Sequence, residues 1–269
     1  ARPRSLSLPL EIEREAAALV PTLRRLAAAL GGGPVTHAVT MTAELSQAFR
    51  TKREGVGFVL DAVGEAFPGD PVKVYALDGR FLDPVEARMR PLEVAAANWA
   101  ATARLVGRRM ADVLLVDIGT TSTDIIPIRG GEPAGVGRSD PERLLAGELV
   151  YSGALRTPVE GVTRSVPLWG GRCPLAPERF ALMGDVYLWL GALDSADYTV
   201  TPPDRRPATR EFAGERLARA VCADAEILDE DAVQSIANAL AEAQLESVVS
   251  GMRRVLARHP GLATAVVAG

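Results

Sequence analysis

The 269-residue sequence predicts an α/β protein built as two lobes. Apolar segments with helical and strand-like spacing alternate over the first 110 residues, and a β-hairpin at 113–128 then begins a second, β-rich unit. The composition, 48% hydrophobic and 24% charged, is that of an ordinary globular protein. We therefore expect an N-terminal lobe at 1–110 and a C-terminal lobe at 111–269.

In the N-terminal lobe we expect three helices and two strands. The helices are predicted at 10–30, 44–67 and 83–108, and the strands at 36–42 and 71–77. The first helix ends at a run of three glycines, and the second has a predicted break near Gly55 and Gly57. Asp83, Pro84 and Glu86 have the residue types of an N-cap, a first-turn proline and a capping box.

In the C-terminal lobe the hairpin is followed by segments rich in glycine and proline. They predict strands over about 130–177, and helices follow at 178–192, 208–222 and 229–258. Acidic residues crowd the start of the last helix, where the helix dipole favours negative charge. The closing residues "LATAVVAG" predict a final strand that runs into Gly269.

The hairpin "VLLVDIGTTSTDIIPI" carries the most informative chemistry. A buried strand ends at Asp117, and Gly119 lets backbone N–H groups approach a bound anion closely. Four hydroxyl side chains that could also contact an anion follow: Thr120, Thr121, Ser122 and Thr123. We predict a phosphate site at this turn, with Asp117 binding Mg²⁺ through water. The alternative is a plain hairpin with a polar tip, although such tips more often contain Asn-Gly or Asp-Gly.

Several other functional classes receive no support. A formal net charge of -4 does not predict nucleic-acid binding, and the P-loop motif G-x-x-x-x-G-K-[ST] is absent from the sequence. Cys173 and Cys222 lack the spacing of a zinc site, and we expect structural roles for His37 and His259. Apolar runs fall short of the ~18 residues of a membrane span, and no signal peptide is evident. We expect a cytoplasmic protein without a membrane partner.

Two resemblances follow from these motifs. The hairpin's D-x-G-x-T-x-x-D pattern resembles the second phosphate motif of the actin, sugar kinase and Hsp70 superfamily, which has a ribonuclease H-like fold. Six segments in order resemble the hydantoinase/oxoprolinase-related proteins of the tetrahydromethanopterin-linked C1 pathway: "TMTAELSQAF", "AANWAATA", "DIGTTSTDIIPI", "GELVYSGALRTPV", "DVYLWLG" and "RLARAVCAD". The resemblance implies a two-lobed actin-like fold whose first phosphate hairpin and C-terminal end we expect outside these residues.

The resemblance also implies an activity in methanofuran or methylofuran cofactor biosynthesis. An aminomethylfuran methyl diphosphate would condense with γ-glutamyltyramine and release pyrophosphate, with Mg²⁺ as cofactor. Asp117 would then position the metal, while Gly119 and residues 120–123 would hold phosphoryl oxygens. The small-molecule partners would be the furan diphosphate and the tyramine-derived substrate, and a homo-oligomer is left open.

Five further residues take roles from the same resemblance. Glu44 would be a metal partner or the base for the phenol, or else a glutamate complementing a helix dipole. Asn98 and Trp99 would contact substrate, or else belong to an ordinary helix face with a core tryptophan. Arg156, followed by Thr157, would offer a guanidinium to phosphate or carboxylate, or else lie on a solvated surface. Glu148 and Asp185 are weaker candidates.

Two alternative functions use the same hairpin. One is an ATP-dependent small-molecule kinase or hydantoinase/oxoprolinase-like hydrolase, in which the turn holds the phosphates of ATP. The other is a non-catalytic, actin-like nucleotide-binding module whose nucleotide state drives closure of the lobes.

Overall fold

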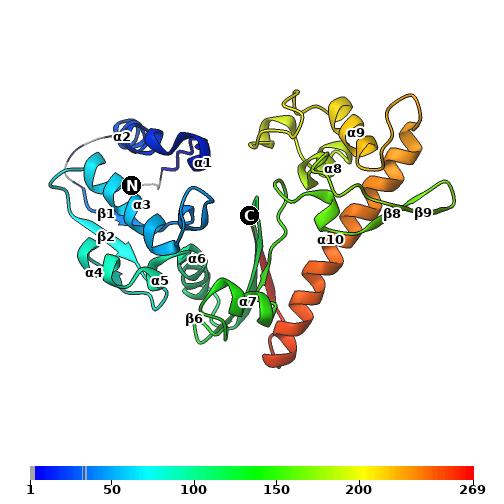
Figure 1. The fold of residues 1–269 in the computed structure, drawn as a ribbon. Helices are drawn as coiled ribbons and strands as arrows, with labels where there is room; N and C mark the ends of the chain where they lie inside the picture. Colours follow the sequence, from blue (N-terminus) through cyan, green and yellow to red (C-terminus); the bar gives the residue numbers. More distant parts are fainter. Residues whose placement is uncertain (1–3, 32, 34) are drawn as a thin grey trace. The chain divides into compact units, whose positions relative to one another are not determined.

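A computed structural model describes residues 4–31, 33 and 35–269. It divides the chain into two compact units, Ala1–Arg109 and Met110–Gly269. The helices and strands are numbered in chain order, and Figure 1 labels them where there is room. Within the described part of the chain, no helix combines the length and the apolar character that crossing a membrane requires.

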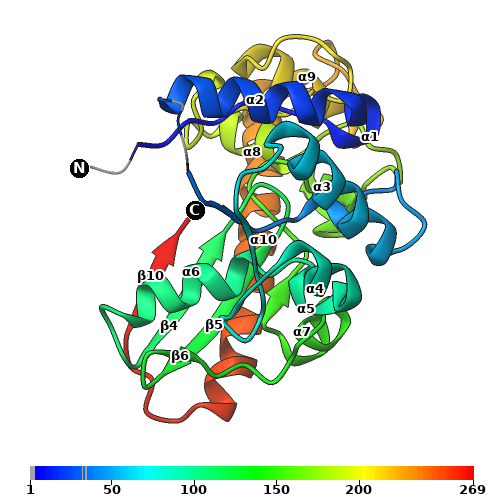
Figure 2. The same ribbon diagram turned by 90° about the vertical axis from the view of Figure 1, so that its left-hand side faces the viewer.

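The first unit is built on a small sheet with helices packed against it. β1 (His37–Val39) pairs in parallel with β2 (Val72–Tyr75), and β2 pairs antiparallel with β3 (Phe81–Leu82). Val56 and Leu60 of α3 (Lys52–Ala66) pack with strand residue Val74 in one buried cluster. α1 (Ile12–Glu15), the 3-10 helix η1 (Ala16–Ala18) and α2 (Leu19–Leu30) precede the sheet, and α2 packs on α3 (Figure 2).

The predicted helix at 44–67 is wrong at its start and in its break. Glu44 lies in a separate 3-10 helix, η2 (Ala43–Leu45), and α3 begins later, where the Thr51 hydroxyl accepts a hydrogen bond from the Glu54 N–H. α3 runs unbroken through Gly55, where the missing side chain allows close packing against η2. A Cβ at Gly55 would lie 2.5 Å from the Cα of Glu44.

The predicted helix at 83–108 is three helices: α4 (Pro84–Met89), α5 (Pro91–Val94) and α6 (Asn98–Gly107). Asp83 caps α4 as predicted, since its carboxylate accepts from the Glu86 N–H at 2.8 Å. Pro91 has no N–H to continue α4 and instead occupies the first turn of α5. Ala96 has a φ of 49°, and this left-handed residue separates α5 from α6.

The second unit has a sheet of order β10-β4-β5-β6, with β7 also paired to β5. Its strands are β4 (Val113–Ile118), β5 (Thr123–Arg129), β6 (Glu132–Pro133), β7 (Leu149–Val150) and β10 (Ala265–Ala268). β4 and β5 are antiparallel, whereas β10 is parallel to β4. The long helix α10 (Glu230–Arg258) lies along one face of this sheet, where its Val248 and Val255 pack against Leu114 and Ile125 (Figure 2).

The rest of the second unit corrects the prediction of strands alone over 130–177. β8 (Ser165–Leu168) and β9 (Gly171–Pro174) form a hairpin, but α7 (Asp140–Ala146) is helical. Its signal is a capping box between Ser139 and Glu142, with Pro141 between them in the first turn. The predicted helices at 178–192 and 208–222 are present in shorter form as α8 (Met183–Trp189) and α9 (Arg210–Arg219), and two 3-10 helices, η3 (Val159–Gly161) and η4 (Ser195–Asp197), complete the unit.

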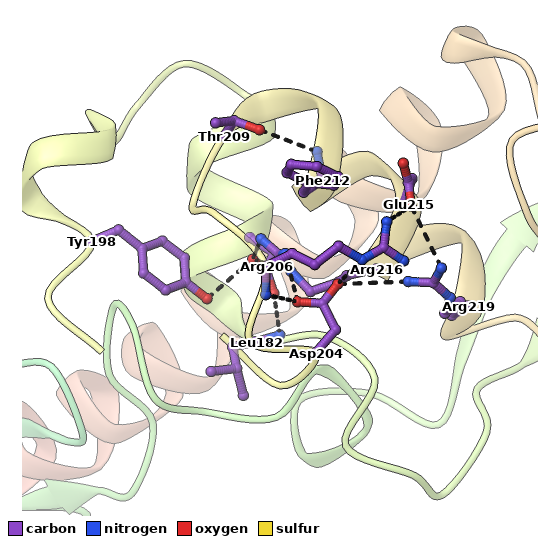
Figure 3. A network of polar contacts seen from close by, with 10 residues as sticks. Leu182, Tyr198, Asp204, Arg206, Thr209, Phe212, Glu215, Arg216 and Arg219 are labelled. Carbon is purple, nitrogen blue, oxygen red and sulfur yellow. Dashed lines mark hydrogen bonds and ion pairs between the residues drawn. The ribbon is translucent and has the colours of Figure 1, made fainter. Parts of the chain in front are cut away.

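A buried ionic network joins α8 to α9 (Figure 3). Arg216 and Asp185 are each 0% exposed, and the guanidinium donates to the carboxylate at 2.7 and 2.9 Å. The Tyr198 hydroxyl and the Leu182 N–H also donate to Asp185, and Asp204 accepts from Arg216 at 3.1 Å. Asp185 therefore has all of its partners within the fold, and its role in the network is structural.

Candidate functional site

The β4 and β5 strands meet in a tight turn at residues 119–122, which we call the phosphate turn after the site that the sequence predicts there. Asp117 pairs directly across the strands with Asp124, and the Gly119 N–H donates to the Ser122 carbonyl at 2.9 Å. Thr120 is exposed, whereas Thr121 and Ser122 are half-buried. The predicted hairpin is confirmed, and its tip is accessible to a ligand.

Residues 152–157, which we call the clamp loop, hold the turn by its carbonyl groups. The Gly119 carbonyl accepts from the Ala154 N–H at 2.9 Å, and the Thr120 carbonyl accepts from the N–H groups of Leu155 and Arg156 at 3.1 and 2.8 Å. In a trans peptide the C=O and N–H groups point in opposite directions. The N–H groups of Thr120 and Thr121 therefore point away from the clamp loop.

These two N–H groups are available to a ligand. Neither makes a hydrogen bond to another backbone group among the residues that the structure describes. Adjacent amide donors that point the same way from a turn can bind an anion between them. The clamp loop thus fixes two amide donors of the turn so that they point away from it.

Gly153 and Thr157 bring the clamp loop against the turn. A Cβ at Gly153 would lie 2.5 Å from the Thr121 nitrogen and 2.6 Å from the Gly119 oxygen, so only glycine fits between the two segments. The Thr157 hydroxyl is buried and accepts from the Gly153 N–H at 2.8 Å. In the structure Thr157 closes the loop internally.

The four hydroxyl residues of the sequence motif separate into two groups. Thr123 belongs to β5, is buried, and donates its hydroxyl proton to the Ser152 carbonyl at 2.8 Å. It thereby ties the strand to the clamp loop. The hydroxyls of residues 120–122 belong to the turn itself.

Asp117 and Asp124 have different surroundings although they lie side by side. Asp124 forms an ion pair with the buried Arg143 at 2.8 Å. Asp117 is half-buried, and its carboxylate has no hydrogen bond or ion pair with any residue in the described ranges. Loss of hydration on burial raises the pKa of both carboxyls, and in Asp124 the charge of Arg143 opposes that rise.

A divalent cation fits this carboxylate. The part of the chain that the structure describes contains no group of three or more His, Cys, Asp or Glu side chains able to bind a metal. Mg²⁺ needs no such group, because it is commonly held by one or two carboxylates together with substrate phosphates and water. Asp117 is half-buried, has no partner among the described residues and lies close in the chain to the two amide donors. It therefore suits this kind of site.

Arg156 is exposed, and its backbone N–H is already bonded to the turn. Its guanidinium makes no ion pair or hydrogen bond with a described residue. The backbone of Arg156 therefore lies against the phosphate turn, and its guanidinium is without a partner among the described residues. Glu148 differs, because its buried carboxylate accepts from the N–H groups of Val136 and Gly137 at 2.7 and 3.0 Å and so supports the local fold.

Three predicted site residues belong to the first unit, whereas the phosphate turn belongs to the second. Glu44 is 2% exposed in η2. Asn98 and Trp99 begin α6, and Trp99 is half-buried against a cluster containing Tyr75 and Ala100. A pocket of about 370 Å³ in the first unit, between α6 and the β1–β3 sheet, is not lined by any of the three.

The sequence prediction missed Gln244. This residue of α10 is 6% exposed, and its Nε2 donates to the Ser152 hydroxyl at 2.6 Å and to the Gly153 carbonyl at 3.0 Å. A signal was present, because Gln244 interrupts the apolar face that Leu240 and Val248 continue at helical spacing. A polar residue on a buried face must have hydrogen-bond partners.

Comparisons with known proteins give matches over most of the chain. The hydantoinase/oxoprolinase family model matches residues 35–267. The chain is 38% identical over 223 residues to the (4-{4-[2-(gamma-L-glutamylamino)ethyl]phenoxymethyl}furan-2-yl)methanamine synthase of Methanocaldococcus jannaschii, which covers 82% of this chain and 67% of that protein. It is 31% identical over 156 residues to the Methanococcus vannielii protein of the same name, covering 58% of this chain and 69% of that one.

A solved structure shows the fold. The nucleotide-free structure of acetone carboxylase, an enzyme of ATP-dependent acetone carboxylation, matches 92% of this chain with a TM-score of 0.50 and 14% sequence identity. This chain spans 42% of the acetone carboxylase chain, less than half of its length. At this identity the likeness concerns fold alone, and with the family match it indicates an α/β protein of the actin-like type.

Proposed function

This chain belongs to the hydantoinase/oxoprolinase family, and from that premise we propose that it catalyses aryl ether formation in the biosynthesis of a methanofuran-type cofactor. The substrates are an aminomethylfuran methyl diphosphate and γ-glutamyltyramine. The bond between the furan methylene carbon and the diphosphate oxygen breaks, and its electron pair leaves with pyrophosphate. The phenol oxygen bonds to the methylene carbon, and the phenol proton passes to a base.

The single observation that carries the proposal is the pair of anion donors in the phosphate turn. The clamp loop binds the Gly119 and Thr120 carbonyls, so the N–H groups of Thr120 and Thr121 point outward. Donors fixed in this way stabilise negative charge that grows on a leaving group without reorganising during the reaction. We assign the diphosphate to this turn, with Arg156 beside it as a further cation.

Asp117 would hold Mg²⁺, which when bound would supply positive charge to the leaving diphosphate. The half-buried carboxylate has no partner of its own among the described residues, in agreement with this role. For the remaining chemistry we propose Glu44 as metal partner or base for the phenol. Asn98 and Trp99 are proposed contacts of the substrates.

Product analysis tests the proposal directly. Protein, Mg²⁺, the furan diphosphate and γ-glutamyltyramine are incubated without ATP, and pyrophosphate and the ether are quantified. We expect equimolar pyrophosphate and ether. Pyrophosphate without ether would indicate hydrolysis instead, and the absence of both products would reject the proposal.

The fold likeness to acetone carboxylase favours a second candidate, an ATP-dependent kinase or hydrolase in which the turn holds ATP. The same two amide donors and the same carboxylate would suit the phosphates of a nucleotide. The two candidates differ in their products. ADP formed from ATP, dependent on a small-molecule acceptor, would select the second candidate.

A further inference from the structure

Gln244 does not contact the phosphate turn itself but hydrogen-bonds to the clamp loop, which holds the turn. Both protons of its Nε2 are used, one by the Ser152 hydroxyl and one by the Gly153 carbonyl. Gly153 is the residue that packs without a side chain against the turn. A movement of the Gln244 amide would therefore be transmitted to the turn through Gly153.

Tyr187 of α8 fixes which way this amide points. Its hydroxyl donates to the Oε1 of Gln244, which leaves Nε2 directed at the clamp loop. Burial raises the pKa of Tyr187, so the phenol keeps the proton that it donates. A chain of hydrogen bonds thus leads from Tyr187 through Gln244 to the clamp loop, and from the clamp loop to the phosphate turn.

We propose that Gln244 is a positioning residue, held by Tyr187, that keeps the clamp loop in place so that the turn's amide donors are aligned for a diphosphate. This inference rests on the proposed function, because it presumes that the turn binds a diphosphate. Gln244 does not touch the ligand itself. It acts through the Ser152 hydroxyl and the Gly153 carbonyl, as residues behind a binding site commonly do.

The chain offers a matched control on the same helix. Gln234 is a half-buried glutamine of α10 that accepts from the Trp189 indole at 3.1 Å and donates to Asn238, with no contact to the clamp loop among the described interactions. Gln244→Met and Gln234→Met each remove one amide from α10 at similar volume. Tyr187→Phe removes only the hydroxyl that orients Gln244, and it serves if Gln244→Met does not fold.

Two measurements on the full chain, well below the melting temperature, test the inference. Hydrogen exchange of the Ala154, Leu155 and Arg156 amides is measured without ligand, and the Kd for inorganic pyrophosphate is measured with Mg²⁺. For Gln244→Met we expect faster exchange at these amides and a Kd raised roughly 10- to 100-fold. Tyr187→Phe should shift both quantities less, and Gln234→Met should shift neither.

The results distinguish the possible failures. Faster exchange with an unchanged Kd would mean that Gln244 has a purely structural role, and unchanged exchange would mean that it does not position the loop. Either outcome overturns the inference. If the unaltered protein does not bind magnesium pyrophosphate at all, the assignment of the diphosphate to this turn is wrong, and the positioning role, which depends on that assignment, is rejected as well.

Discussion

Burial of the charged Asp117 carboxylate lowers the free energy of unfolding, and this predicts an effect of pH on stability. Its pKa is raised in the folded state by loss of hydration, so ionisation favours the unfolded chain. Below the ordinary aspartate pKa of about 3.9 this cost is absent, and it grows as pH rises through the folded pKa. Asp117→Asn should therefore raise the midpoint of thermal unfolding at neutral pH but not at pH 3.

The same substitution should abolish tight binding of magnesium pyrophosphate, since the amide cannot bind Mg²⁺ as the carboxylate does. Thermal melts across the pH range and equilibrium binding measure the two effects separately. At each pH the melting temperature of the variant is compared with that of the unaltered protein. If the substitution lowers it at neutral pH and not at pH 3, burial is not the cause of the raised pKa of Asp117.

Gly153 gives a second prediction at this scale. Its Cβ would overlap the backbone of the phosphate turn, so Gly153→Ala must move one of the two segments. We expect a loss of about 1–3 kcal/mol in the free energy of unfolding and weaker pyrophosphate binding. Gly161→Ala is the matched control, because no described atom outside its chain neighbours lies within 4 Å of a Cβ built there. Equal effects of the two substitutions in denaturant titrations would count against the close contact.

At this scale the sequence predicted part of the candidate site. Asp117 and Gly119 were identifiable because a carboxylate and a glycine end a buried strand. The separate, buried position of Thr123 could not be predicted, because it depends on a hydrogen bond to Ser152, 29 residues away. Gln244 was missed for a related reason, since its partners in the clamp loop lie 91 and 92 residues earlier in the chain.

Among the elements, α8 and α9 depend on the buried pair of Asp185 and Arg216. Arg216→Met would leave the Asp185 carboxylate buried without its cation, and we expect a loss of about 3–5 kcal/mol in the free energy of unfolding. Arg253→Met is the control, because its ion pair with Glu246 is exposed and should contribute at most about 1 kcal/mol. Chemical denaturation measures both, and a loss below 1 kcal/mol for Arg216→Met would contradict the structural role.

Element types were more predictable than element boundaries. The 113–128 hairpin was predicted from two apolar runs around a polar turn, and the last helix was predicted with acidic residues at its start; both are confirmed. The helix predicted at 83–108 failed because Pro91 and the left-handed Ala96 divide it, and helical spacing does not register a backbone angle. Helix α7 was missed because the glycine and proline around it outweighed the capping box at Ser139.

For the whole molecule, ligand binding should appear as added stability. A ligand that binds only the folded protein stabilises it by about 2.7 kcal/mol at a concentration 100 times its Kd. Magnesium pyrophosphate should thus raise the melting temperature in a concentration-dependent way, and magnesium chloride alone should not. Asp117→Asn should lose this response. A rise that persists unchanged in the variant would place the ligand at another site.

The most direct test of the account is a crystal structure of the protein grown with magnesium pyrophosphate. We expect phosphoryl oxygens within hydrogen-bond distance of the Thr120 and Thr121 amide nitrogens, and a Mg²⁺ ion bound between the diphosphate and Asp117, directly or through water. A well-ordered diphosphate elsewhere in the molecule, with these amides facing only solvent, would contradict the claim that this turn binds phosphate.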